Sequence, residues 1–177
     1  YLTAARRSSF CTECRACPGA PCRAFGACWI RGCKTPPVPA ITGRVEVNLT
    51  VRDPARSAVW YTELLGMRQR YDYTSDDRRM RYICLVEPNS ELVICLVGHA
   101  ANPGAAFSEL RTGLDHLEFL VSSREELQKW ADHLDELGIL HSGAKDLDYT
   151  PNAMLTFRDP DNIQLEFFWR APSIVEA

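Results

Sequence analysis

The sequence predicts an α+β fold in which two βαβββ modules form a curved mixed sheet shaped like a cup. The first observation is an internal repeat, because VEVNLTVRD from Val45 and DHLEFLVSS from Asp115 begin segments with one order of elements. Each segment contains an alternating strand, a polar cap, an amphipathic helix and a Leu-Gly pair. The second observation is that the segment ends, VEPNSELVICLV and FRDPDNIQLEFF, also align, at an offset of 71 residues.

Module one begins with a strand that has polar side chains on one face and aliphatic side chains on the other. Asp53 is a natural N-cap, and Pro54 suits the first turn of the following helix. Gly66 favours a left-handed stop at the end of this helix. Two further strands are expected at residues 68–73 and 80–86, before the turn and strand that complete the module.

Module two repeats this order. Its first strand leads into Ser123, which is expected to form a capping box with Glu126 at the start of the second helix. Gly138 favours a left-handed stop at the end of that helix. Two strands are expected at 140–145 and 153–157, followed by the turn and the last strand.

The composition changes sharply near the N-terminus. Residues 1–40 carry a net charge of +5 and six of the eight cysteines, whereas the remaining residues carry −8. We expect this Cys-, Arg- and Pro-rich segment to be a disordered extension. A small zinc-binding segment is the alternative, because Cys-x₂-Cys pairs are common halves of zinc sites. The repeat places a folded domain at 41–171, with module one at about 43–99 and module two at about 113–170.

The overall charge and hydropathy exclude several classes of protein. A net charge of −3 gives no support to nucleic-acid binding. No stretch approaches the roughly 18 apolar residues of a membrane span, and no secretory signal is present. The sequence therefore predicts a cytoplasmic protein, in which cysteines usually stay reduced.

The polar faces of the strands gather side chains that could bind a metal ion. Aligning the modules places Glu46 opposite His116, and Cys95 opposite Glu166. Carboxylate and imidazole ligands together suit a divalent ion with open positions for a substrate. The alternative is that these residues are only solvated polar side chains on an exposed sheet face.

Three motifs, VEVNLTVRDPARSAVWYTELLGM, GLDHLEFLV and TFRDPDNIQLEFF, resemble the glyoxalase/bleomycin-resistance/extradiol-dioxygenase (vicinal oxygen chelate) superfamily over residues 43–169. The resemblance implies a metal in the cup, held by the first and last strands of each module. His116 and Glu166 match the usual ligands, whereas Glu46 and Cys95 depart from the common pattern. Dioxygenase-like members use three ligands, which here would be Glu46, His116 and Glu166.

The resemblance implies two functions. The first is a metal-dependent enzyme with isomerase, lyase or dioxygenase chemistry on a small oxygenated substrate. Its divalent ion would be Mn, Fe, Ni, Mg or Zn, and Glu166 would move a proton. The second is a metal-free protein that binds a drug or metabolite, as bleomycin-resistance proteins do. A homodimer is compatible with both. The residues expected to line the cup are Asn48, Cys84, Cys95, Glu118 and Phe168.

The spacing of two cysteines predicts that they meet. A tight hairpin closed by Glu87 and Leu92 would pair Cys84 with Cys95 across it, on one sheet face. Two adjacent thiols could bind a metal or undergo redox chemistry. Alternatively, they only fill space as small apolar side chains.

Overall fold

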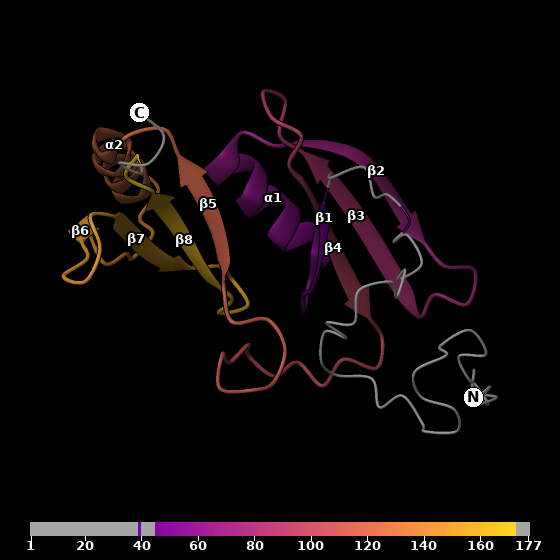
Figure 1. The fold of residues 1–177 in the computed structure, drawn as a ribbon. Helices are drawn as coiled ribbons and strands as arrows, with labels where there is room; N and C mark the ends of the chain where they lie inside the picture. The colour runs from indigo at the N-terminus through magenta and orange to yellow at the C-terminus, as the bar shows by residue number, and fades with distance from the viewer. Residues whose placement is uncertain (1–38, 40–44, 173–177) are drawn as a thin grey trace, which may run out of the picture. The chain divides into compact units, whose positions relative to one another are not determined.

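The strands form two four-stranded sheets, each with its own helix, in a computed structural model that describes residues 39 and 45–172 (Figure 1). The described residues 45–172 belong to one compact unit. The first sheet has the order β1-β4-β3-β2 and the second the order β5-β8-β7-β6. In the first module the elements are β1 (Glu46–Thr50), α1 (Pro54–Leu65), β2 (Arg68–Thr74), β3 (Met80–Val86) and β4 (Val93–His99). In the second they are β5 (Leu117–Val121), α2 (Arg124–Glu136), β6 (Lys145–Asp146), β7 (Ala153–Arg158) and β8 (Gln164–Trp169).

The predicted α+β class and the repeated βαβββ order are confirmed. In each sheet the first strand pairs in parallel with the last, and the other pairs are antiparallel. The parallel pairs follow from the long connections through the rest of each module, whereas tight turns join antiparallel strands. The expectations for residues 1–40 lie outside the described residues, apart from Pro39. No described helix has the length and apolar character needed to cross a membrane.

One predicted strand of module two is much shorter than expected. Instead of a strand over 140–145, the structure has the two-residue β6 and an isolated bridge between His141 and Phe157. Gly143 has a φ of 72°, which is left-handed rather than extended. This backbone turn interrupts the pairing with β7.

The two helices begin differently. Asp53 caps α1, because its Oδ1 accepts bonds from two backbone amides of the first turn, at 3.0 and 3.2 Å. The predicted capping box of α2 is wrong, since the Ser123 side chain makes no capping bond. The Glu126 carboxylate pairs instead with a lysine three residues later. Gly66 and Gly138 both have positive φ, as predicted.

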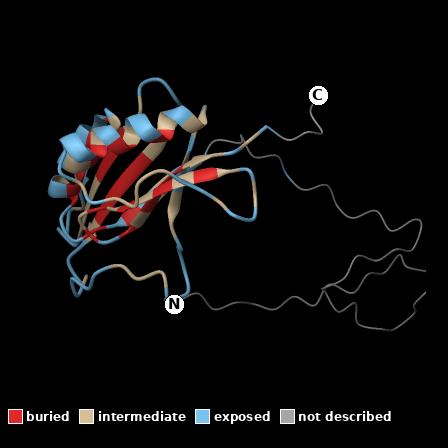
Figure 2. Ribbon diagram, turned by 90° about the vertical axis from the view of Figure 1, so that its left-hand side faces the viewer, coloured by how far each residue is buried: buried red, intermediate tan, exposed pale blue. Residues whose placement is uncertain are grey.

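A shared hydrophobic core joins the helices to the apolar faces of both sheets. Figure 2 shows buried residues on the strands beneath the helices and exposed residues on the outer side of the helices. The core is strongly aromatic, with Phe167 stacked on Trp130 at 4.1 Å and on Phe157 at 5.1 Å between ring centroids. Burying such rings removes large apolar areas from water and stabilises the fold.

The turn between β7 and β8 docks on the start of α1 and so links the two modules. The backbone N–H of Arg52 donates to Oδ1 of Asp161 at 3.1 Å, and its guanidinium pairs with the same oxygen. Deeper in the core, the Tyr61 hydroxyl donates to Asp159 at 3.2 Å. These polar contacts fix the module-two turn beside the carboxyl end of β1.

Candidate functional site

The first group of candidate residues lies on the polar face of module one. Glu46, Asn48 and Tyr82 come together because β1 and β3 both flank β4. The Tyr82 hydroxyl lies 2.9 Å from Oε1 of Glu46 and 2.6 Å from Oδ1 of Asn48. The Cys95 thiol donates to the same Glu46 oxygen at 3.1 Å. Glu46 is therefore an oriented acceptor at the edge of the sheet.

These hydrogen bonds set the protonation states in this group. The thiol of Cys95 lowers the pKa of Glu46, and the Tyr82 hydroxyl lowers it further. Burial raises the pKa values of Cys95 and Tyr82 far above their ordinary range. At neutral pH the group therefore holds one carboxylate with a neutral thiol and a neutral phenol as donors.

Cys84 and Cys95 face each other across the β3–β4 ladder, which confirms the predicted pairing. Both are buried and free. Glu87 donates its N–H to the carbonyl of Leu92 at 3.0 Å, so alternation along the ladder makes Cys84–Cys95 a non-hydrogen-bonded pair. Side chains approach most closely at such pairs. Together with Glu46, the cysteines place three potential metal-binding atoms within 4.8 Å of one another.

The second group lies at the equivalent positions of module two. Glu166 on β8 is only 6% exposed and pairs in register with Glu118 of β5. Burial raises the pKa of Glu166, while the His116 imidazole opposes the rise and Glu118 adds to it. Nδ1 of His116 lies 2.6 Å from Oδ1 of Asp115, which leaves Nε2 as the ring nitrogen available to bind an ion. Phe168 also belongs to this group, and the Arg170 guanidinium lies 5.9 Å from the centroid of its ring.

The structure brings the predicted ligands together in two groups. Glu46 lies with the cysteine pair, and His116 lies near enough to Glu166 to influence its pKa. Within the part of the chain that the structure describes, Glu46, His116 and Glu166 do not form a cluster with ligand atoms within 4.8 Å. The reason is that β1 and β5 belong to separate sheets.

Sequence reasoning missed two residues that orient these groups. Tyr82 precedes Cys84 by two positions on β3, so strand alternation places it on the same face. The two-residue period of a strand could therefore have predicted Tyr82 from the sequence. Asp115 directly precedes His116, but adjacency alone does not predict that its carboxylate bonds the imidazole.

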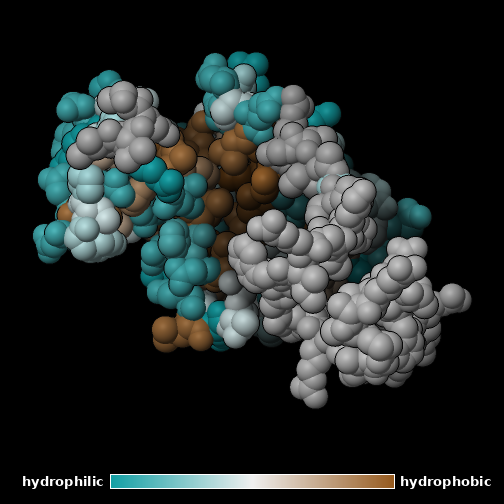
Figure 3. All heavy atoms as spheres, viewed as in Figure 1, coloured by the Kyte–Doolittle hydropathy of each residue, from teal (hydrophilic) through white to brown (hydrophobic). Residues whose placement is uncertain are grey.

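Apolar side chains also stand on these two faces. Tyr71 and Tyr73 of β2 pair with Cys84 and Tyr82, and Leu120 follows Glu118 by two positions. All three are at least 43% exposed. Hydrophobic residues also gather in the middle of the view in Figure 3, beside the hydrophilic surface of module two. An organic ligand could therefore contact apolar as well as polar groups here.

Comparison with known protein families shows to which superfamily the chain belongs. The model of the Glyoxalase/Bleomycin resistance protein/Dioxygenase superfamily matches residues 43–167, which is most of the chain. The chain belongs to this superfamily. The resemblance seen in the sequence motifs is thereby confirmed, although no curated protein matches the chain.

Solved structures of superfamily proteins share its fold. A glyoxylase/bleomycin resistance protein/dioxygenase domain from Frankia sp. EAN1pec is 33% identical, with a TM-score of 0.66, and the match covers 75% of this chain and 100% of that one. A glyoxalase family protein from Enterococcus faecalis is 24% identical, with a TM-score of 0.58 and coverage of 70% and 94%. The fosfomycin resistance protein FosX from Listeria monocytogenes, complexed with Mn(II) and sulfate, is 17% identical, with a TM-score of 0.55 and coverage of 77% and 98%.

Proposed function

We propose that this superfamily member is a metal-dependent enzyme that acts on a small oxygenated molecule. The observation that carries the proposal is the placement of ionisable donors at repeat-equivalent positions of both modules. Glu46 and Cys95 lie in β1 and β4 of one sheet, whereas Glu166 lies in β8 of the other sheet and His116 directly precedes β5. Two such faces opposed to each other would form one centre with carboxylate and imidazole ligands.

The residues fit a divalent ion. Glu46 is held ionised, and the Asp115 carboxylate orients His116 so that Nε2 is available. Glu46, His116 and Glu166 would hold the ion, which suits Mn, Fe, Ni, Mg or Zn. Cys95 remains a protonated thiol beside the site, because burial raises its pKa. The Mn(II) complex of FosX, which shares the fold, makes manganese the first ion to test.

The faces that carry these ligands belong to different sheets of one chain. We expect them to oppose each other in a homodimer, with module one of one copy facing module two of the other. A dimer interface of this kind would also cover the exposed Tyr71, Tyr73 and Leu120. Analytical ultracentrifugation with and without metal tests this assembly.

The chain's own groups have distinct chemical roles in this proposal. A bound divalent ion would supply Lewis acidity to a substrate oxygen. Glu166 would accept a proton from the substrate and return it, because a carboxylate released from the ion is free to act as a general base. Tyr71 and Leu120 contact the apolar part of the substrate. This arrangement suits isomerase or lyase chemistry, in which a proton changes place.

Metal analysis tests the proposal directly. We expect purified protein loaded with Mn²⁺ to retain about one ion per chain, and His116→Ala to lose it, because the variant lacks one of the three proposed ligands. His99→Ala is the matched control, since His99 lies exposed at the end of β4. Equal metal content in the two variants, or none in the wild type, would contradict the proposal.

A second candidate is a metal-free protein that binds a drug or metabolite. It is favoured by the bonds from Cys95 and Tyr82 to Glu46, which satisfy this carboxylate without an ion. Binding of a small ligand that survives complete removal of divalent ions by EDTA, without turnover, would support this candidate. Loss of binding after EDTA treatment would exclude it.

A further inference from the structure

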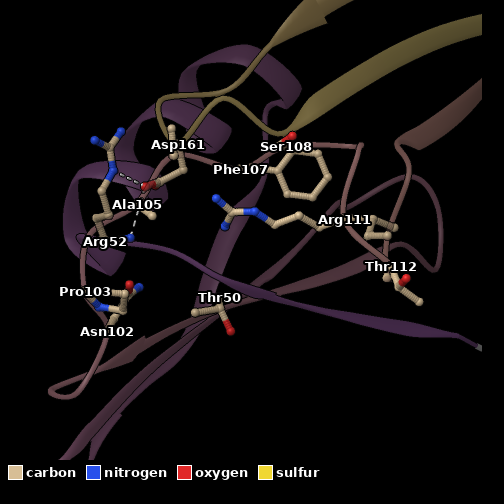
Figure 4. A pocket seen from close by; sticks show the side chains of 13 residues that line it. Thr50, Arg52, Asn102, Pro103, Ala105, Phe107, Ser108, Arg111, Thr112 and Asp161 are labelled. Carbon is tan, nitrogen blue, oxygen red and sulfur yellow. Dashed lines mark hydrogen bonds and ion pairs between the residues drawn. The ribbon is translucent and has the colours of Figure 1, made fainter.

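A cavity of about 290 Å³ lies where the connection between the modules passes the end of β1 (Figure 4). One wall is the chain from Asn102 to Leu114, and the other walls are Thr50, Arg52 and Asp161. None of these residues belongs to the proposed ligand set. A volume of this size holds a small organic molecule or a hydrated ion.

The cavity contains the positive charge of Arg111, for which no described residue supplies a counter-charge. In Figure 4 the guanidinium of Arg111 extends into the middle of the lining residues. Within the described part of the chain it makes no side-chain hydrogen bond and no ion pair. Arg52, on the opposite side, is already neutralised by its ion pair with Asp161. The lining residues therefore keep a net positive charge at Arg111.

Neutral donors surround this guanidinium. Thr50 and Thr112 have hydroxyl groups with no hydrogen bond to a described residue, and both line the cavity. Ser108 accepts a bond from the N–H of Leu110 at 3.3 Å, which leaves its own proton free to donate. The ring of Phe107 lies beside Arg111 and gives the cavity an apolar wall.

We propose that this cavity binds the carboxylate, phosphate or phosphonate group of a small organic anion. The guanidinium of Arg111 presents paired N–H donors that match two oxygens of such a group. Hydroxyl donors would complete the contacts, and Phe107 would pack against the organic part. The site is separate from the proposed metal ligands, because Thr50 lies four residues beyond Glu46, about 13 Å along β1.

Binding of three small probes to full-length protein tests the site. Methylphosphonate and propionate carry the two kinds of anionic group, and propionamide is an uncharged analogue of propionate. Each is titrated by NMR or calorimetry into wild-type protein and into Arg111→Gln. Arg68→Gln is the matched control, because Arg68 is exposed on β2, has no described ion partner, and its loss changes the net charge equally.

We expect at least one anion to bind the wild type and Arg68→Gln alike, and Arg111→Gln about tenfold more weakly or worse. The preferred anion distinguishes a carboxylate ligand from a phosphonate or phosphate ligand. The proposal is overturned if neither anion binds, if propionamide binds equally well, or if both variants weaken binding to the same degree. Because the assay needs no metal and no turnover, its outcome is independent of the proposed enzymatic function.

Discussion

Asp159 shows how one buried carboxylate supports the fold. Its Oδ1 accepts bonds from the backbone N–H groups of Asp161 and Ile163 at 2.8 and 2.7 Å, and Oδ2 accepts from the Tyr61 hydroxyl at 3.2 Å. Burial raises the pKa of Asp159, although the three donors oppose this rise. The side chain thus closes the β7–β8 turn and fastens it to α1.

Replacing Asp159 should strongly destabilise the protein. We expect Asp159→Ala to lower the free energy of unfolding by about 2–4 kcal/mol, because three buried donors lose their acceptor. Asp159→Asn, which keeps one oxygen, should lose less. Urea denaturation measures both, with Asp148→Ala as control because Asp148 is exposed. A loss in Asp159→Ala no larger than in the control would show that the turn does not depend on these bonds.

At the scale of single elements, the helix starts differ in how much their first residues contribute. Asp53 bonds two amides at the start of α1, whereas Ser123 at the start of α2 makes no capping bond through its side chain. Both positions have extended backbone, so the difference lies in the side chains alone. Substitutions at the two positions therefore measure how much a capping side chain adds to the free energy of unfolding.

The two positions therefore provide a paired prediction. We expect Asp53→Ala to lower the free energy of unfolding by about 1 kcal/mol, and Ser123→Ala by only a few tenths. Chemical denaturation of both variants under one set of conditions provides the measurement. If Ser123→Ala were the more damaging change, the capping geometry of the two helices would be reversed in solution.

For the molecule as a whole, the connection between the modules is itself anchored. Glu109 in this connection pairs with Arg158 of β7 at 2.8 Å. The Phe107 carbonyl accepts from the Asn162 side chain at 2.9 Å, and its N–H donates to the Asp161 carbonyl at 2.9 Å. The connection that lines the cavity beside Arg111 is thus attached to the β7–β8 turn, which docks on the start of α1.

The Glu109–Arg158 pair predicts a dependence of stability on pH. The Arg158 guanidinium lowers the pKa of Glu109 to about 2 from an ordinary value of 4.5. The contribution of the pair is therefore present above pH 4.5 and is lost as pH falls toward 2. Thermal unfolding across this range should show a shallower acid decline for Glu109→Gln than for the wild type. Parallel curves for the two proteins would contradict this assignment.

Local chemistry explains which elements the sequence predicted well. The extent of α1 follows from an N-cap and a glycine stop, both of which are local signals. The strand expected at 140–145 failed because Gly143 adopts a left-handed backbone. The capping box at Ser123 failed because the Glu126 carboxylate pairs with Lys129 instead of the backbone at the helix start.

The sequence by itself predicted which side chains share each polar face, because the strand period of two and the internal repeat select Glu46, His116 and Glu166 without further information. It also determined the pairing of Cys84 with Cys95. Only the tertiary structure decided that the Tyr82 hydroxyl reaches Glu46, and that Arg111 enters a cavity in which no described residue pairs with its guanidinium. Both depend on contacts between segments that are distant along the chain, and no local pattern encodes such distances.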